Sequence, residues 1–278
     1  MPDLTAAALP VIAFIGGGNM ASAILGGLLR QGLPTASVEV VEPFEEARMR
    51  LARDFGVSAQ PSASDALGRC QVVVWAVKPQ TFADAARPVR DLTPGALHLS
   101  VAAGISSDSI AAWLGTDNVV RAMPNTPALI GQGMSGLFAR PAVSADGRRL
   151  VEQVLAPTGQ LLWVDTESAL DAVTAVSGSG PAYVFYFIEA MTEAGIEMGL
   201  PPAQAQQLAI GTFTGASALA QASTEPPSVL RERVTSKGGT TYAALSAMEA
   251  AGVKAQFKTA IRTAEQRARE LAAEFGST

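Results

Sequence analysis

Residues 16–21 read Gly-Gly-Gly-Asn-Met-Ala, which fits the spacing G-x-G-x-x-A of a dinucleotide-binding turn. The turn follows the apolar run Val11–Ile15 and precedes a helix-like stretch, as a strand–turn–helix unit requires. The first glycine permits a tight turn, the third lets the backbone approach a pyrophosphate, and the helix N-terminus offers N–H donors to the phosphates. A merely structural glycine turn is the alternative. The expected cofactor contacts in this segment are Gly16, Gly18, Asn19, Met20 and Ala21.

Glu42 ends the next apolar run, Val38–Val41, and lies 21 residues after Ala21. The fingerprint expects an acid at about this distance, where a carboxylate accepts hydrogen bonds from the adenine ribose hydroxyls and repels a 2′-phosphate. Glu42 therefore favours NADH over NADPH as the cofactor. Because Arg48 or Arg50 could still reach a phosphate, the sequence leaves both reduced cofactors open. A solvated acid without a ligand is the alternative for Glu42.

Three later segments also follow apolar, strand-like runs, and each is expected at the same edge of the predicted sheet. Ligands of an open parallel sheet lie across the carboxyl ends of the strands, where small residues leave room for the ribose and the nicotinamide. Lys78 lies in the first of these segments and is one of only four lysines in the chain. A solvated loop lysine is its alternative. The expected cofactor contacts are Ala76, Val77, Lys78, Pro79, Ala102, Ala103, Gly104 and Asn125.

A second glycine turn lies in the last part of the chain. Ser236–Thr241 reads Ser-Lys-Gly-Gly-Thr-Thr and opens a helix-like stretch, Thr241–Ala250. Such a turn presents backbone N–H groups to an anion, as a phosphate-binding loop does. A plain helix N-cap formed by threonine or serine is the alternative.

Taken together, these motifs resemble the pyrroline-5-carboxylate reductase family along essentially the whole chain. Residues 14–21 are shared with many dehydrogenases, whereas Val234–Thr241, continuing through 244–249, is the most specific segment. The other matching segments are Ala76–Gln80, Arg121–Pro127 and Ser177–Tyr183. The resemblance implies a Rossmann domain, a helical dimerisation domain, and an active site shared between the subunits of a homodimer or a larger ring.

The resemblance also implies roles for the second turn. The substrate carboxylate would be held by the hydroxyl and N–H groups of the turn, and Thr241 matches the family's threonine beside the ring nitrogen. Thr241 is therefore the expected catalytic residue, since its hydroxyl would orient the imine carbon toward the nicotinamide. The chain departs from simpler members at Glu42 and at Lys237, where some relatives carry proline. The expected substrate contacts are Ser236, Gly238, Gly239, Thr240, Thr241, Glu167 and Ser177.

The elements that position these residues alternate between strands and helices up to about residue 165. Short runs that are apolar throughout, separated by helices, are typical of a parallel sheet covered on both faces. Strands are expected at Val11–Ile15, Val38–Val41, Val72–Ala76, Leu97–Ala102 and Val119–Met123, with Gly136–Phe138 and Leu161–Val164 as extensions. Helices are expected at Asn19–Arg30, Glu45–Phe55, Phe82–Arg90 and Ser107–Leu114.

From about Glu167 onward, alanine-rich helical stretches replace the strands. They are expected at Ala182–Met198, Ala203–Gln221, Val229–Val234, Thr241–Ala250 and Val253–Phe275. The predicted fold class is thus α/β, with a Rossmann-like doubly wound domain over 1–165 and an all-helical dimerisation and substrate-binding domain over 166–278. Ala172–Ile188 carries no charge and ends in crowded aromatic residues, which predicts burial against a subunit partner. With the family resemblance, this partner is expected to be a second copy in a homodimer with intertwined helical domains. Burial of this stretch against the sheet domain is the alternative.

Composition excludes several classes of function. A net charge of −5 and a pI near 5.0 give no basic surface for nucleic acid. With Cys70 and His98 as the single residues of their types, an internal disulfide and a Cys/His zinc site are excluded, and no metal is expected. Residues 4–29 carry no charge, but their glycines favour a strand, a turn and a packed helix over a membrane span. The opening residues lack the basic region of a secretory signal, so a cytoplasmic protein is expected.

The predicted reaction is hydride transfer from NADPH or NADH to the ring imine of 1-pyrroline-5-carboxylate, which gives proline in the last step of proline biosynthesis. A protonated imine needs orientation and exclusion of water more than a strong acid, which suits a site without a histidine. His98 is accordingly expected to be structural. A 3-hydroxy acid dehydrogenase is disfavoured because Pro181–Gly199 has no lysine to act as general acid. A non-catalytic dinucleotide sensor is disfavoured by the second glycine turn.

Overall fold

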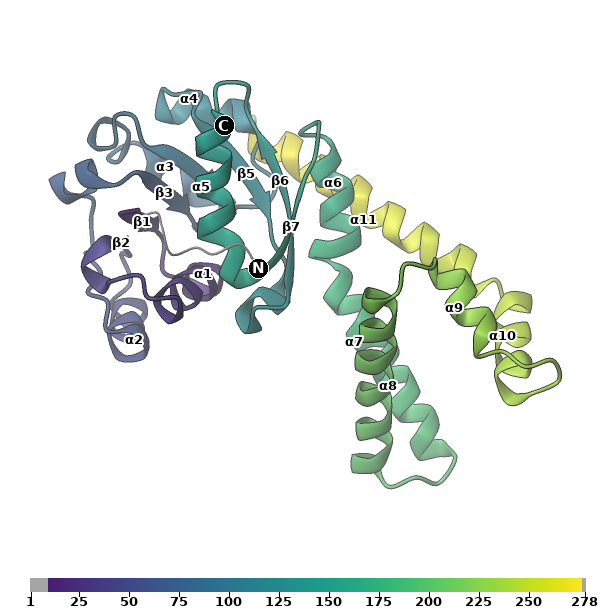
Figure 1. Ribbon diagram of the computed structural model, residues 1–278. Helices are drawn as coiled ribbons and strands as arrows, with labels where there is room; N and C mark the ends of the chain where they lie inside the picture. The colour runs from purple at the N-terminus through teal and green to yellow at the C-terminus, as the bar shows by residue number, and fades with distance from the viewer. Residues whose placement is uncertain (1–9, 277–278) are drawn as a thin grey trace. The chain divides into compact units, whose positions relative to one another are not determined.

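The computed structural model describes residues 10–276 of the chain. The chain divides into two compact units (Figure 1): one contains the described residues up to Gly178 and from Glu265 onward, and the other contains Ser179–Ala264. The change from strands to helices follows Trp163, close to the expected change near residue 165. Residues 166–178 and the end of the last helix are grouped with the sheet in the compact units.

The first unit is built on a seven-stranded sheet in the order β2-β1-β3-β4-β5-β6-β7. All neighbouring strands are parallel except β5 and β6, which are antiparallel. This arrangement confirms the predicted α/β class. The strands are β1 (Ile12–Ile15), β2 (Val38–Val41), β3 (Val72–Trp75), β4 (Leu97–Ser100), β5 (Val119–Met123), β6 (Gly133–Ala139) and β7 (Gly159–Trp163). The helices are α1 (Asn19–Arg30), α2 (Glu45–Phe55), α3 (Phe82–Ala86), α4 (Ser107–Leu114), α5 (Ala145–Leu155) and α6 (Ala169–Val173).

Side chains of the strands point alternately into two apolar cores. In β1, Ile12 and Phe14 belong to one core, and Ala13 and Ile15 belong to the other, because successive side chains of a strand face opposite sides of the sheet. Helices α1 and α5 close the first core, and α3 and α4 close the second. Helices therefore lie on both faces of the sheet (Figure 1), which explains why its strands are apolar throughout.

The main differences from the expected elements of the first unit concern α3, α5, α6 and β6. Helix α3 ends at Ala86 rather than Arg90, because Pro88 has no N–H group to continue the helical hydrogen bonds. Helices α5 and α6 were not predicted. Strand β6 is longer than Gly136–Phe138, since it starts at Gly133 and ends at Ala139.

The second unit is helical, as predicted. Helices α7 and α8 lie side by side (Figure 1) and are joined by a turn at Gly199, whose φ is +95°. They pack through small residues, because a Cβ atom on Gly195 would lie 3.0 Å from that of Ala205. The helices are α7 (Gly180–Glu197), α8 (Pro202–Ala222), α9 (Pro227–Arg233), α10 (Thr240–Ala250) and the first part of α11 (Val253–Gly276).

An aromatic cluster joins α7 to the start of α11 within the second unit. The rings of Tyr183 and Phe187 pack edge-on against Phe257, with centroid distances of 5.7 and 5.4 Å. Such edge-to-face pairs place the positive ring edge against the negative ring face. Within residues 10–276, no helix is long and apolar enough to cross a membrane.

Candidate functional site

The first glycine turn brings three strand ends together. Gly16 has a φ of +95°, and a Cβ atom at this position would lie 2.6 Å from the carbonyl oxygen of Ala76. Its N–H donates to the carbonyl oxygen of Val41 at 2.8 Å. Only glycine adopts this backbone at such a close approach. The ends of β1, β2 and β3 therefore meet at the turn, and Val77 lies beside it, 3.1 Å from the same Cβ position.

The N-terminus of α1 is open above this turn. Nothing lies within 4 Å of a Cβ atom placed on Gly18, which is the N-cap residue and has no side-chain capping bond. The first turn of α1 carries no acidic residue, so its N–H groups are available to an anion. Ala21 is buried against the core, and its small side chain lets α1 approach the sheet. These residues fit a dinucleotide pyrophosphate.

Glu42 lies against the same turn and is buried. Its Oε2 accepts from the N–H of Gly17 at 2.7 Å, and its Oε1 accepts from the N–H of Phe44 at 2.9 Å. Arg48 donates to the carbonyl oxygens of Glu42 and Pro43, and Arg50 donates to that of Gly17. Both arginines predicted as possible phosphate contacts are thus attached to backbone oxygens around the turn.

The remaining predicted cofactor contacts lie at the carboxyl ends of β3, β4 and β5. Lys78, the third residue after β3, is exposed, and its carbonyl oxygen accepts from the N–H and hydroxyl of Thr81. Beyond β4, Ala102 is buried, and Gly104 has a φ of +73°. A Cβ atom on Gly104 would lie 3.2 Å from the ring of Phe275, so the last turn of α11 lies beside this strand end.

Asn125, after β5, contacts a predicted substrate residue. Its amide nitrogen donates to the carbonyl oxygen and the hydroxyl of Ser177, both at 3.2 Å, and its Oδ1 accepts from the N–H of Met134 at 2.9 Å. Ser177 lies in a π-helical turn, Thr174–Gly178. Such turns are frequent at functional sites. The structure therefore brings these two predicted residues together, 52 positions apart.

Glu167 is held by a partly buried network that sequence reasoning missed. Its carboxylate accepts from the N–H and hydroxyl of Ser107 at 2.5 and 2.6 Å, and from the guanidinium of Arg121 at 2.6 Å. Arg121 lies on β5 and is only 9% exposed. The available signal was a charged residue inside an apolar run, because a buried guanidinium requires a counter-charge.

The second glycine turn has a similar open helix end. Gly238 has a φ of +77°, and the N–H of Gly239 donates to the carbonyl oxygen of Ser236 at 3.0 Å. A Cβ atom on Gly239 would lie 2.7 Å from the Ser236 hydroxyl. Helix α10 starts at Thr240, without a side-chain capping bond and without an acidic residue in its first turn. The turn therefore groups the predicted residues Ser236–Thr241, and Lys237 is exposed within it.

Other groups that could do chemistry lie outside this arrangement. His98 is buried in β4, where its Nδ1 accepts from the indole N–H of Trp75 at 3.1 Å, and burial lowers the pKa of His98 to about 4. Burial likewise raises the pKa of the Cys70 thiol to about 11. Among the residues described, no group of three or more His, Cys, Asp or Glu could hold a metal ion.

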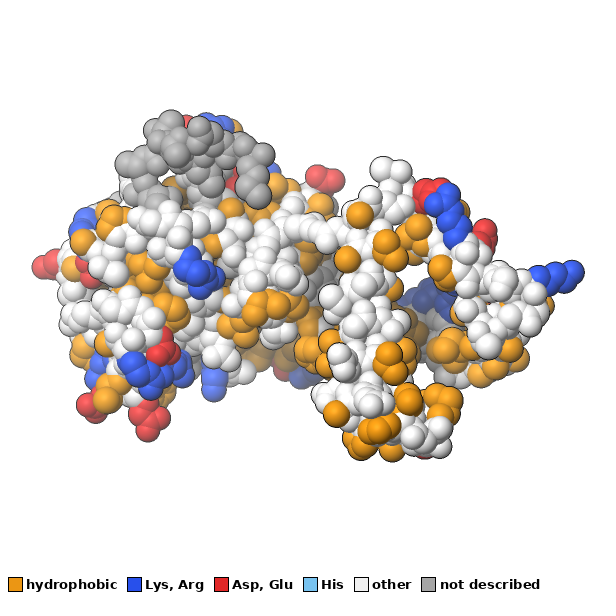
Figure 2. Space-filling model, turned by 60° about the horizontal axis from the view of Figure 1, so that its bottom comes forward, with side chains coloured by type: hydrophobic (Ala, Val, Ile, Leu, Met, Phe, Trp, Pro, Cys, Tyr) orange, Lys and Arg blue, Asp and Glu red, His pale blue; other side chains and the backbone are white. Residues whose placement is uncertain are grey.

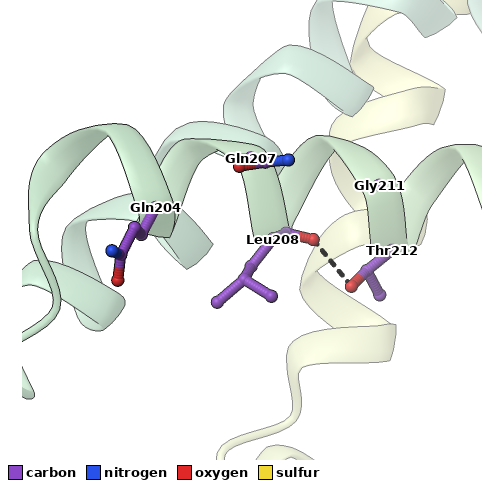
Figure 3. A pocket seen from close by; sticks show the side chains of 5 residues that line it. All are labelled: Gln204, Gln207, Leu208, Gly211 and Thr212. Carbon is purple, nitrogen blue, oxygen red and sulfur yellow. Dashed lines mark hydrogen bonds between the residues drawn. The ribbon is translucent and has the colours of Figure 1, made fainter.

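A pocket is lined by side chains of α8 (Figure 3). Its lining includes none of the predicted site residues, and the one hydrogen bond drawn there runs from the Thr212 hydroxyl to the carbonyl oxygen of Leu208 at 2.8 Å. The pocket therefore belongs to the surface of the helical unit rather than to either glycine turn. The lining residues are Gln204, Gln207, Leu208, Gly211 and Thr212.

Comparisons with known proteins cover both parts of the chain. One family model, described as pyrroline-5-carboxylate reductase dimerisation, matches residues 167–271, and another, described as NADP oxidoreductase coenzyme F420-dependent, matches residues 11–104. The chain is 45% identical to the pyrroline-5-carboxylate reductase of Pseudomonas aeruginosa over 96% of this chain and 98% of that protein. It is 40% identical to that of Haemophilus influenzae over 94% of this chain and 97% of that protein. A solved pyrroline-5-carboxylate reductase from Coxiella burnetii matches with a TM-score of 0.90 and 34% identity, over 95% of this chain and 99% of that one.

Proposed function

The chain belongs to the pyrroline-5-carboxylate reductase family, and we propose that its two glycine turns hold the two reactants of that family's reaction. The protein is an NAD(P)H-dependent reductase that reduces the C=N bond of L-1-pyrroline-5-carboxylate and gives L-proline. The observation that carries the proposal is a matched pair of helix ends. Helices α1 and α10 each start at a glycine N-cap, without a side-chain cap or an acid in the first turn.

The cofactor is assigned to the first turn. The N–H groups at the start of α1 would take the pyrophosphate, and Glu42 would lie at the adenine ribose. The carboxyl ends of β3, β4 and β5 would line the ribose and nicotinamide. When bound, the reduced nicotinamide supplies the hydride. The proposed contacts are Gly16, Gly18, Asn19, Met20, Ala21, Glu42, Ala76, Val77, Lys78, Pro79, Ala102, Ala103, Gly104 and Asn125.

The substrate carboxylate is assigned to the second turn. The N–H groups of Gly238, Gly239 and Thr240 and the hydroxyl of Ser236 would hold it, because uncapped N–H groups at a helix N-terminus favour an anion. Lys237 adds a positive charge to the same turn and strengthens the attraction for a carboxylate. This use of the turn explains why the N-cap of α10, Gly239, is a residue without a capping side chain.

Thr241 is proposed to act at the ring nitrogen. Reduction of a protonated imine needs no strong acid, because the carbon is already electrophilic once the nitrogen carries a proton. The Thr241 hydroxyl would hydrogen-bond that nitrogen and fix the face of the ring that receives the hydride. Glu167 and Ser177 stay predicted substrate contacts. Their bonds to Arg121, Ser107 and Asn125 would fix the side chains before the substrate binds.

We further propose a homodimer with intertwined helical domains, or a larger ring built from such dimers. In α7, α8 and α10 the fully buried residues are Gly195, Ala205 and Ala209, too few for a stable core. Groups of hydrophobic side chains are instead visible on the surface of the helical unit (Figure 2). Phe185, Tyr186 and Leu219 are among the exposed hydrophobic residues of this unit. Residues 1–165 and 166–278 are the proposed dinucleotide-binding and dimerisation domains, in a cytoplasmic enzyme.

One experiment tests the reaction and the choice of cofactor together. The purified protein is mixed with L-1-pyrroline-5-carboxylate and either NADH or NADPH, and the loss of reduced nicotinamide absorbance and the formation of proline are followed. Both are expected, with NADH the better donor because Glu42 repels a 2′-phosphate. The proposal would be contradicted if the protein oxidised the reduced cofactor with a keto acid, giving a 3-hydroxy acid, but did not oxidise it with the pyrroline.

A further inference from the structure

Phe44 is an exception among the aromatic residues of the first unit. Its side chain is 73% exposed, whereas every other aromatic side chain described in that unit is buried or half-buried. A single exposed apolar residue is ordinary on a protein surface, so exposure alone assigns no role. The connection of Phe44 to the dinucleotide turn is the second observation.

The backbone of Phe44 is bonded to the same carboxylate as the dinucleotide turn. Each oxygen of the Glu42 carboxylate accepts one of these hydrogen bonds: Oε1 accepts from the N–H of Phe44, and Oε2 accepts from the N–H of Gly17. Arg48 then fixes the intervening backbone through the carbonyl oxygens of Glu42 and Pro43, at 3.0 and 2.7 Å. The exposed ring is therefore carried on a segment with a defined position beside the turn.

A dinucleotide meets these groups in a fixed order. Its pyrophosphate lies at the glycine turn and its adenine ribose at the acid that ends β2, so its adenine lies beyond that acid. We propose that Phe44 is the stacking platform for the adenine ring of NAD(P)H. This inference rests on the assignment of the cofactor to residues 16–21 made above.

The chemistry of the two rings suits this role. An exposed phenyl ring presents a flat π-face, and a purine stacks on such a face without needing a particular hydrogen-bond pattern. The same contact covers an apolar surface that the protein leaves open. Stacking does not depend on the ribose 2′-substituent, so Phe44 strengthens NADH and NADPH alike, whereas Glu42 discriminates between them.

Calorimetric titration of the full-length protein with cofactor fragments tests the assignment. ADP-ribose carries the adenine and the pyrophosphate, and nicotinamide mononucleotide lacks the adenine. Phe44→Ala is expected to raise the Kd for ADP-ribose and for NADH about tenfold and to leave the Kd for nicotinamide mononucleotide unchanged. Phe44→Tyr keeps the ring and should stay within about twofold of the wild type. Met49→Ala, at a residue 66% exposed on α2, is the matched control and should change neither Kd.

Two results would overturn the assignment. One is an unchanged Kd for ADP-ribose in Phe44→Ala, and the other is an equal rise in both fragment Kd values, which would mean that the ring acts through the turn. Failure of the proposed function looks different, because the wild type itself would then not bind NADH or reduce the pyrroline.

Discussion

The Thr241 hydroxyl is the one side-chain group of the second glycine turn that the proposed reaction places at the reacting C=N bond. Thr241→Ala should lower kcat/KM for the pyrroline by about ten- to a hundredfold, the range expected for one lost hydrogen bond to a reacting group. Thr241→Ser keeps the hydroxyl and should recover most of the activity. Steady-state kinetics with saturating NADH provide the measurement, and an unchanged kcat/KM in Thr241→Ala would remove the role.

Variants of Glu42 test a different property, the preference for NADH over NADPH. The Glu42 carboxylate accepts from the N–H groups of Gly17 and Phe44, and the proposed cofactor site would place a 2′-phosphate beside this carboxylate. Glu42→Gln removes the charge with little change in shape and should lower the ratio of kcat/KM for NADH to that for NADPH by about tenfold, since one close charge repulsion is worth about 1 kcal/mol or more. Glu42→Ala should shift the ratio in the same direction.

The matched control for that measurement is Glu39→Gln, because Glu39 lies on the same strand and pairs with Arg69 away from the turn. The ratio should not change in this variant. A wild type that already favours NADPH strongly would show that the charge of Glu42 does not set the preference.

Among the elements, β5, the start of α4 and the entry to α6 depend on one another through Glu167. Glu167→Ala would leave the buried Arg121 side chain without the carboxylate that it contacts. Loss of one partner of a buried ion pair costs about 3–5 kcal/mol, and the partial exposure of this pair puts the expected loss of unfolding free energy at the lower end. Chemical denaturation measures that loss.

A variant pair separates this structural role from contact with the substrate. Ser107→Ala removes a hydroxyl donor to Glu167 but leaves the carboxylate in place. It should lower the unfolding free energy by about 1 kcal/mol without raising KM for the pyrroline. If Glu167 also contacts the substrate, Glu167→Ala raises KM under conditions where the variant is fully folded. An unchanged KM in that variant would limit Glu167 to holding the elements together.

The sequence predicts an element well when the pattern that defines it lies within a few consecutive residues. Strands β1 to β5 follow from apolar runs of a few residues, and the turn at Gly16 follows from a local spacing. Helix α5 has a local signal too, since the Ser144 side chain caps it by accepting from the N–H of Gly147. Its early Asp, Gly and Arg residues obscured the apolar face formed by Val151, Val154 and Leu155.

The contacts that the sequence could not predict join distant residues. Arg121 and Glu167 are 46 positions apart, and Asn125 and Ser177 are 52 apart. No local pattern pairs them, because the pairing depends on where the sheet brings β5 relative to the entry of α6. The position of Glu42 was predictable from the fingerprint, but its bonds to two backbone N–H groups were not.

For the whole molecule, the buried imidazole of His98 links stability to pH. Burial lowers its pKa to about 4 from an ordinary 6.5. Above pH 6.5 the residue is neutral in both the folded and the unfolded protein. Between pH 6.5 and 4 only the unfolded chain takes up the proton, so the unfolding free energy falls as the pH falls. The total loss is on the order of 3 kcal/mol, from 1.36 kcal/mol per pKa unit.

His98→Gln isolates this contribution, because an amide oxygen can still accept from the Trp75 indole but does not titrate. As the pH falls from 7 to 4, the unfolding free energy of the wild type should fall relative to that of the variant. Below pH 4 the difference between the two should stay constant. Both proteins are denatured at the same protein concentration, because the apparent stability of an oligomer depends on that concentration. A difference that stays constant from pH 7 to 4 would mean that His98 takes up its proton in the folded protein as readily as in the unfolded one.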